Sequence, residues 1–213
     1  ADLDALPFPD RTLTPYRKYS SVVAKRLPIT TMFTSRGCPF RCSFCSRPHL
    51  GKSFRARSAI NVVDEMEACA RRGIREVLIY DDTFTVNRER VHSVADEIIR
   101  RGLDVGWDIR ARVDCVDARL LERIKAARCE RIHYGIEAGT EKILKVLNKG
   151  ISLAQAKAAV SLTKKLGIQT LAYFMIGAPT ETRDDILRTI DFALELDAIV
   201  MLPDQLFYNT GIF

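Results

Sequence analysis

Three cysteines lie within one short stretch of this chain, and their spacing is its strongest chemical signal. Cys38, Cys42 and Cys45 form a C-x3-C-x2-C pattern. Cysteine thiolates bind iron–sulfur clusters, and three of them suit a 4Fe–4S cluster whose fourth iron has no protein ligand and can bind another molecule. Positive charges stabilise thiolates and an anionic cluster. The stretch carries three such charges, at Arg36, Arg41 and Arg47.

The two other interpretations of the cysteines are a structural zinc site and a disulfide scaffold. A structural zinc site needs four ligands, and His49 could join the three cysteines as the fourth. A disulfide scaffold is not expected, because the chain has 213 residues and no secretory signal. We expect the remaining cysteines, Cys69, Cys115 and Cys129, to be buried thiols.

The cysteine loop must be positioned by strands and helices that alternate along the chain. Apolar and β-branched runs predict strands at 29–35, 76–82, 105–113, 131–139 and 168–179, with a sixth inside 198–212. Apolar residues at helical spacing predict intervening helices, which begin near Ser58, Asn87, Asp117, Thr140, Ser152 and residue 181. Ser152 and Gln155 match a capping box. The regular βα period predicts an α/β fold with parallel strands. Six units cannot close an eight-stranded barrel, so we expect a partial (βα)6 TIM-like barrel.

Composition agrees with one globular domain. Apolar residues make up 47% of the chain and charged residues 28%. No apolar run is long enough for a membrane-spanning helix, and no signal peptide opens the chain, so we expect a cytoplasmic protein. Residues 1–28 are rich in proline and predict a lead-in from an upstream domain. Residues 29–213 form the predicted core domain, which we expect to be truncated at its C-terminus because no helix follows the last strand.

Basic residues gather in the first part of the chain. Residues 11–63 contain eleven Lys or Arg and no Asp or Glu, although the net charge of the whole chain is only +6. This asymmetry indicates an anionic partner nearby, with a solvated basic face as the alternative. Nucleic acid is one candidate partner. Because aromatic residues are not interleaved with the basic ones, an anionic cofactor is favoured over a nucleic-acid stacking surface.

Polar residues follow the predicted strands at the end where barrel enzymes carry their chemistry. Asp81 and Asp82 follow the second strand, Arg112 ends the third and Glu137 lies in the fourth. We expect these side chains to surround one cavity together with the cysteine loop. No substrate acid or base stands out. Tyr173 and Tyr208 are weak candidates, and His133 is expected to be a satisfied core histidine.

The cysteine pattern and the strands around it resemble the radical S-adenosylmethionine (radical SAM) superfamily. An aromatic residue, Phe44, precedes the last cysteine, and the pattern follows the first predicted barrel strand. The resemblance covers residues 29–212. It implies that Cys38, Cys42 and Cys45 ligate three irons of a 4Fe–4S cluster. It also implies that the amino and carboxylate groups of S-adenosylmethionine chelate the fourth iron.

The resemblance also assigns further cofactor contacts. Phe44 would lie near the adenine, and Met175 and Ile176 would pack against it. Glu137 would touch the cofactor, and Lys149 would meet its carboxylate. Many members of the family place a glycine-rich motif at the methionine amino group, whereas this chain has acidic residues there. The implied cofactor-binding set is Phe44, Asp81, Asp82, Arg112, Glu137, Lys149, Met175 and Ile176.

The implied activity is reductive cleavage of S-adenosylmethionine to a 5′-deoxyadenosyl radical, with flavodoxin or ferredoxin as electron donor and an unidentified substrate. The runs LPFPDR, FRARSAINVVDEM and YDDTFTVNRERV look like radical enzymes that carry a cobalamin-binding domain. This similarity implies methyl transfer or cyclisation with cobalamin bound by a domain absent from this chain. The alternatives are an RNA-modifying radical enzyme such as a methylthiotransferase, and a non-catalytic iron–sulfur or zinc module.

Overall fold

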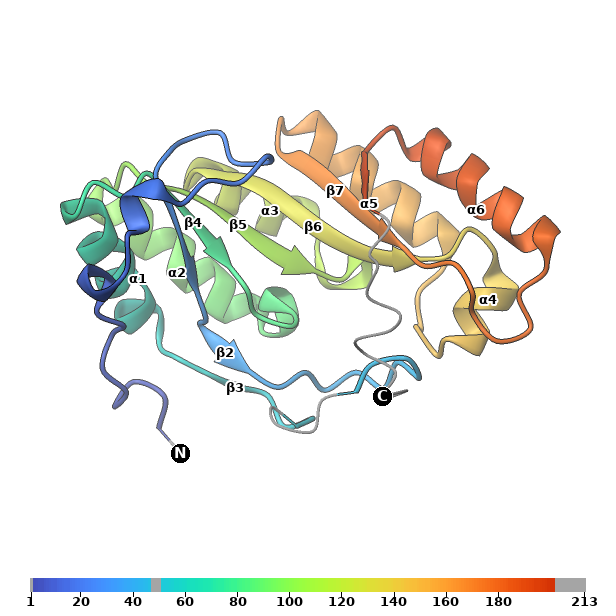
Figure 1. The fold of residues 1–213 in the computed structure, drawn as a ribbon, viewed down its shortest axis with the longest axis horizontal. Helices are drawn as coiled ribbons and strands as arrows, with labels where there is room; N and C mark the ends of the chain where they lie inside the picture. The colour runs from blue at the N-terminus through green and yellow to red at the C-terminus, as the bar shows by residue number, and fades with distance from the viewer. Residues whose placement is uncertain (1, 47–50, 202–213) are drawn as a thin grey trace.

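A parallel six-stranded sheet forms the centre of the molecule. The computed structural model describes residues 2–46 and 51–201 (Figure 1). The strands lie in the order β1-β4-β5-β6-β7-β8, and every neighbouring pair is parallel. This arrangement confirms the predicted α/β fold with an open, barrel-like sheet. The strands are β1 Ile29–Met32, β4 Glu76–Ile79, β5 Gly106–Ala111, β6 Cys129–Glu137, β7 Gln169–Phe174 and β8 Ile199–Met201.

Helices connect the strands and cover one face of the sheet. They are α1 Ala59–Arg71, α2 Arg88–Arg101, α3 Ala118–Ala126, α4 Glu141–Val146, α5 Leu153–Lys165 and α6 Arg183–Leu196. Each begins after a residue whose side chain accepts a hydrogen bond from the first turn, which satisfies a backbone donor that the helix cannot. The predicted capping box of Ser152 and Gln155 is confirmed. Within the described residues, no helix has the length and apolarity needed to cross a membrane.

Strand residues alternate between the helix-covered face and the opposite face, which we call the inner face. Trp107 and Ile109 of β5 are fully buried in the core beneath the helices. The Trp107 indole Nε1 donates to the Ala127 carbonyl oxygen at 2.7 Å. Neighbouring side chains in a strand point to opposite faces, so the polar residues between these core residues point inward. The inner face carries Tyr80, Asp108, Arg110, Arg131, His133 and Tyr173.

Most strands are shorter at their carboxyl ends than the sequence predicts. The chain turns through the 3-10 helices Phe84–Val86 after β4 and Val113–Cys115 after β5. After β7, Gly177 adopts a φ of +94°, and its backbone N–H donates to the Glu181 carboxylate at 2.5 Å. The predicted first strand, 29–35, is divided. β1 ends at Met32, and Ser35–Arg36 forms β2, which pairs antiparallel with β3 Arg55–Ala56. Apolar runs therefore mark where strands exist but not where their polar ends begin to turn.

The lead-in is packed against the sheet rather than held away from it. The guanidinium of Arg11 is buried, pairing with the Glu65 carboxylate of α1 at 2.6 Å and donating to the Thr30 hydroxyl of β1 at 2.9 Å. The Ile29 backbone N–H donates to the Tyr19 carbonyl oxygen. Residues 2–28 thus belong to the packed fold. A domain upstream of them stays a prediction.

A substitution at Gly139 tests the close packing of the link between β6 and α4 on α6. An alanine Cβ there would lie 2.5 Å from the Thr189 Cα and 2.6 Å from the Arg188 carbonyl oxygen. Backbone atoms cannot move aside cheaply, so Gly139→Ala should lower the free energy of unfolding by about 1–3 kcal/mol in urea denaturation. Gly106→Ala is the control. Its Cβ meets the flexible side chain of Glu130 at 3.2 Å, and the expected change is within about 0.5 kcal/mol.

Candidate functional site

The carboxylate of Asp81 fixes the start of the cysteine loop. It is fully buried and accepts hydrogen bonds from the backbone N–H groups of Thr34 and Ser35, at 2.6 and 3.0 Å. The hydroxyls of the same two residues donate to its other oxygen, at 2.5 and 2.6 Å. Both oxygens are therefore engaged by the segment that leads to Cys38. The contact with the cofactor amino group stays a prediction, and the geometry gives Asp81 the task of positioning the loop.

Arg90 of α2 reinforces this junction from the helix side. Its guanidinium donates to the Thr34 carbonyl and hydroxyl oxygens at 3.0 and 2.7 Å, and to the Arg57 carbonyl oxygen at 2.8 Å. It also lies over the Phe84 ring at 5.3 Å. Burial lowers the pKa of Arg90, an effect that the nearby Asp81 carboxylate opposes. Charge-assisted hydrogen bonds of this kind are about twice as strong as neutral ones, so Thr34 is held from two sides.

The cysteine loop then crosses the carboxyl end of the sheet. The Cys38 Sγ lies 3.5 Å from the Thr83 hydroxyl, which follows β4. Further along, the Ser43 backbone N–H donates to the Leu147 carbonyl at 2.9 Å, and the Asn148 amide donates to the Arg41 carbonyl at 2.7 Å. The loop is thus tied to β4 at one end and to the turn after α4 at the other.

Arg112 connects the middle of this loop to the rest of the site. Its Nη1 lies 3.8 Å from the Cys42 Sγ, and its guanidinium stacks on the Phe40 ring at 3.9 Å. The other nitrogens form a two-pronged ion pair with Asp114 and donate to the Lys149 carbonyl at 2.8 Å. Burial disfavours the charge, but the Asp114 carboxylate outweighs it and raises the pKa of Arg112. A permanent positive charge therefore stands beside one predicted iron ligand.

Glu137 and Lys149 form a buried ion pair on the other side of the loop. The Lys149 Nζ lies 2.7 Å from a Glu137 carboxylate oxygen and 5.6 Å from the centre of the Phe44 ring. Glu137 has a φ of +76° where the pairing of β6 with β7 is irregular. A Cβ on Gly135 would lie 2.5 Å from the Glu137 carboxylate, so the absence of a side chain there makes room for the pair. The structure therefore brings together three residues for which sequence analysis predicts cofactor contacts.

The remaining predicted contacts lie around the same end of the sheet. Asp82, three residues after the end of β4, is exposed. Met175 is buried after β7, and its backbone N–H donates to the Glu137 carbonyl oxygen at 2.8 Å. Ile176 is half-buried. Their contacts with a bound cofactor stay predictions.

The chemistry of the three loop thiols suits an iron–sulfur cluster. Among the residues that the structure describes, no three His, Cys, Asp or Glu side chains converge on one ion position. A 4Fe–4S cluster does not need such convergence, because each thiolate binds a different iron. His49, the fourth ligand of the zinc alternative, lies outside the described residues. Cys38, Cys42 and Cys45 would hold the cluster.

The other three cysteines are free thiols, and the prediction that they are buried is confirmed for Cys69 and Cys129 but not for Cys115. Cys69 and Cys129 are buried, and Cys115 is half-buried. Burial raises the pKa of Cys69 and of Cys115 to about 11, and it raises the pKa of Cys129 as well. These thiols stay protonated near neutral pH, which does not suit metal binding.

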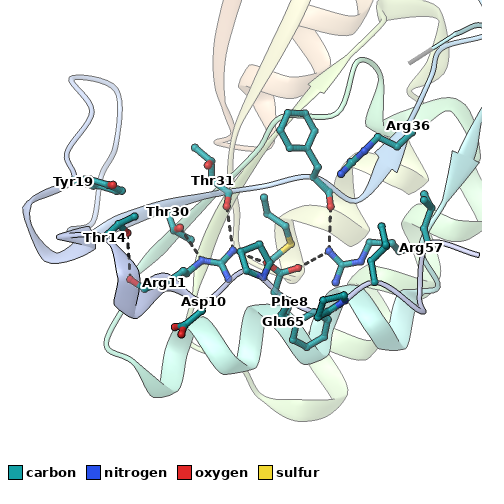
Figure 2. Close-up of a pocket in the computed structure, with 16 residues that line it drawn as sticks. Phe8, Asp10, Arg11, Thr14, Tyr19, Thr30, Thr31, Arg36, Arg57 and Glu65 are labelled. Atoms are coloured by element: carbon teal, nitrogen blue, oxygen red, sulfur yellow. Dashed lines mark hydrogen bonds and ion pairs between the residues drawn. The ribbon is translucent and has the colours of Figure 1, made fainter. Parts of the chain in front are cut away.

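Part of the basic excess is neutralised within the chain. Arg11 and Arg57 both pair with Glu65, and Lys25 and Arg26 pair with acidic residues beyond β4. Figure 2 shows the Glu65 pairs at the bottom of a cavity of about 390 Å³ between the lead-in, β1 and α1. We assign the part of this cavity around the Glu65 pairs to the packing of the lead-in, whereas Phe33 and Arg36 line the part nearest the cysteine loop.

Three side chains on the inner face form a hydrogen-bonded series that sequence analysis did not predict. The His133 Nδ1 lies 2.9 Å from the Tyr173 hydroxyl, and its Nε2 lies 3.2 Å from the Asp108 carboxylate. His133 is satisfied, as expected, but its partners were not foreseen. The signal was present in the sequence as polar residues at alternate positions of buried strands.

The model of the radical SAM superfamily matches residues 32–193. An uncharacterized methyltransferase of Pyrococcus horikoshii is 37% identical over 198 residues, which are 92% of this chain and 42% of that protein. The anaerobic magnesium-protoporphyrin IX monomethyl ester cyclase of Rubrivivax gelatinosus is 33% identical, covering 90% of this chain and 35% of its own length. The chain therefore spans less than half the length of these relatives.

Solved structures share the fold. The radical S-adenosylmethionine methyltransferase TsrM from Kitasatospora setae, with tryptophan and a SAM analog bound, gives a TM-score of 0.74 at 24% identity, covering 80% of this chain and 34% of that one. The cobalamin-dependent radical enzyme OxsB gives 0.71 at 24% identity, covering 84% and 28%. At this identity the two structures support the fold alone.

Asp81→Asn should weaken the junction that holds the loop. The substitution removes the charge from four hydrogen bonds, and bonds to charged groups contribute about 1.5–3 kcal/mol each. We expect lower iron and sulfide content after anaerobic reconstitution, together with reduced stability in urea. Asp104→Asn serves as control, because Asp104 is an exposed carboxylate that pairs with surface arginines. Equal iron content in both variants would contradict the positioning role.

Arg112→Gln should make the cluster harder to reduce. Reduction adds negative charge, and the substitution both removes a cation beside Cys42 and leaves Asp114 uncompensated. We expect the reduction equilibrium to fall about tenfold or more, which is a shift of about 59 mV to more negative potential for one electron. Potentiometric titration followed by electron paramagnetic resonance measures this shift. Arg71→Gln, which breaks an exposed ion pair with Glu67 on α1, should leave the potential unchanged.

Proposed function

The chain belongs to the radical SAM superfamily, and from this we propose that it is the catalytic core of an enzyme that reductively cleaves S-adenosylmethionine at a 4Fe–4S cluster. One observation carries the proposal. The loop of Cys38, Cys42 and Cys45 is fixed at the carboxyl end of a parallel sheet, between Arg112 and the buried Glu137–Lys149 pair. When bound there, the reduced cluster and S-adenosylmethionine would supply a 5′-deoxyadenosyl radical.

The chain's own residues would bind the two groups and hold them in place. The thiolates of the three loop cysteines would ligate iron, and Arg112 would offset their negative charge. The Lys149 ammonium can donate to a carboxylate and the Glu137 carboxylate can accept from an ammonium, so this pair matches both polar ends of an amino acid. Phe44, whose ring centre is 5.6 Å from the Lys149 Nζ, and Met175, whose backbone N–H bonds to the Glu137 carbonyl oxygen, would offer apolar surface to a flat base.

We infer that the reaction is cobalamin-dependent methyl transfer or cyclisation. The curated relatives include a tryptophan 2-C-methyltransferase at 29% identity and the cyclase already described, and the solved neighbour OxsB binds cobalamin. Cobalamin would be held outside this chain. A putative methylthiotransferase at 34% identity matches the RNA-modifying alternative, which is not better supported. Enzymes of this family need an electron donor, for which we propose flavodoxin or ferredoxin, and a reducing compartment such as the cytoplasm suits the thiols.

Electron paramagnetic resonance of the reconstituted, reduced protein tests the cluster and its open iron together. We expect a reduced 4Fe–4S signal that changes when S-adenosylmethionine is added, because the sulfonium compound would chelate the iron without a cysteine. Cys42→Ala should abolish the signal, and Cys69→Ala, which removes a buried thiol of α1, should keep it. A wild-type signal indifferent to S-adenosylmethionine, or stoichiometric zinc in place of iron, would overturn the proposal.

A further inference from the structure

Two aromatic rings stand exposed on the inner face of the sheet. Phe33, directly after β1, is 45% exposed, and Tyr80, directly after β4, is 40% exposed. Their ring centroids are 6.5 Å apart in an edge-to-face arrangement. Large aromatic residues usually lose most of their exposure on folding. A pair left open where two strands end offers a surface on which a flat ligand can stack.

A guanidinium lies on each of these rings. Arg110 of β5 is 3.7 Å from the centre of the Tyr80 ring, and Arg36 is 4.9 Å from that of Phe33. Both arginines are half-buried, and neither has an Asp or Glu partner within ion-pair distance among residues 2–46 and 51–201. By contrast, Arg112 and Arg131 on the same side of the sheet are paired. The Arg36 Nη1 donates to the Ser35 carbonyl oxygen at 2.9 Å, and the remaining donors of the two stacked guanidinium groups can bind a carboxylate or phosphate.

The hydrogen-bonded series of Asp108, His133 and Tyr173 ends beside Arg110. The His133 Nε2 lies 3.2 Å from the Asp108 carboxylate and its Nδ1 2.9 Å from the Tyr173 hydroxyl, and a neutral ring that donates from Nε2–H to the carboxylate accepts from Tyr173 at Nδ1. Burial raises the pKa of Tyr173, while Arg110 lowers it and the neighbouring Tyr80 and Asp108 raise it further. The phenolic oxygen keeps lone pairs for a further donor. This end of the series can therefore orient a polar group on a ligand that sits against Arg110.

The strand register places this surface next to the cysteine loop site. Arg110 pairs with His133, and Tyr173 pairs with Gly135, the residue that leaves room for Glu137 and Lys149. Tyr173 therefore lies opposite Gly135, two residues before Glu137 of the ion pair that we assign to S-adenosylmethionine. A ligand stacked on the inner face would lie beside the proposed cofactor, where a substrate has to be.

We propose that this inner-face surface binds the substrate and that the substrate is a flat conjugated ring bearing a carboxylate or phosphate. The ring packs against the edge-to-face pair of Phe33 and Tyr80, and the anion is held by Arg110 with Arg36. Tyr173, oriented by His133 and Asp108, completes the contact. The proposal rests on the proposed function, because the surface is assigned to a substrate through its place beside the cofactor residues.

Binding of two matched pairs of flat compounds to the full-length reconstituted protein tests this substrate class. Flavin mononucleotide and riboflavin differ by a phosphate, and indole-3-propionate and its amide differ by a carboxylate charge. We expect the acidic member of at least one pair to bind tenfold or more tightly than its neutral partner. The pair that shows the preference identifies phosphate or carboxylate as the anion. Equal or absent binding within both pairs would overturn the proposal.

Matched variants place the preference on this surface. Arg110→Gln should abolish it, whereas Arg88→Gln, at an exposed ion pair on α2, should retain it. Tyr173→Phe should weaken the acidic ligand several-fold. Tyr134→Phe should not, although it removes a buried hydroxyl bonded to Thr163 on the opposite face of the same sheet. A preference that survives Arg110→Gln would overturn the assignment.

The same samples separate this inference from the proposed function. The cluster signal and its response to S-adenosylmethionine are recorded beside each binding curve. A wild-type protein that lacks the response fails the proposed function, whatever its ligand preference. A wild-type protein that responds normally but shows no preference for the acidic ligands fails the substrate inference alone.

Discussion

The buried carboxylate of Asp81 is the interaction on which the arrangement of the site depends. It comes from the end of β4 but is used by the backbone and side chains of Thr34 and Ser35, beyond the end of β1. Burying a charged carboxylate costs free energy unless hydrogen-bond donors surround it. Here the donors belong to the residues that lead into the cysteine loop. The position of the three loop thiols is thereby set by the pairing of β1 with β4.

A second buried charge network organises the inner face below the site. Arg131 is fully buried and pairs with Glu76 and, at 3.3 Å, with Asp108. Asp108 in turn faces His133, so the charges of three strands are joined across the sheet. Removing one partner of such a group leaves an uncompensated buried charge, which is far more costly than the pair itself is stabilising. The polar inner face is therefore a built part of the fold, and Arg110 differs from it by lacking an acidic partner among the described residues.

The sequence predicted the fold well because its signals were local. Apolar periodicity located each strand, and Ser58, Asn87, Asp117 and Ser152 identified helix starts through hydrogen bonds within one turn. The strand ends were predicted poorly, since polar residues such as Arg112 leave the ladder to bond with distant groups. The three loop cysteines were evident from spacing alone. The role of Asp81 in holding the start of the cysteine loop could not be foreseen, because it depends on residues beyond another strand. The same is true of the hydrogen bond from Tyr173 to His133, which joins two strands.

The lead-in also has a consequence for the edge of the sheet. β1 is an outer strand, and an uncovered outer strand offers unpaired backbone groups to any other chain that can extend the sheet. The lead-in occupies part of this edge, since Tyr19 accepts from the Ile29 backbone and Arg11 donates to the Thr31 carbonyl oxygen. A shortened protein that began at the first strand would expose these groups together with the Glu65 carboxylate. Residues 2–28 therefore cover part of the edge at which another chain could add a strand. They should be included in any shortened form of the protein.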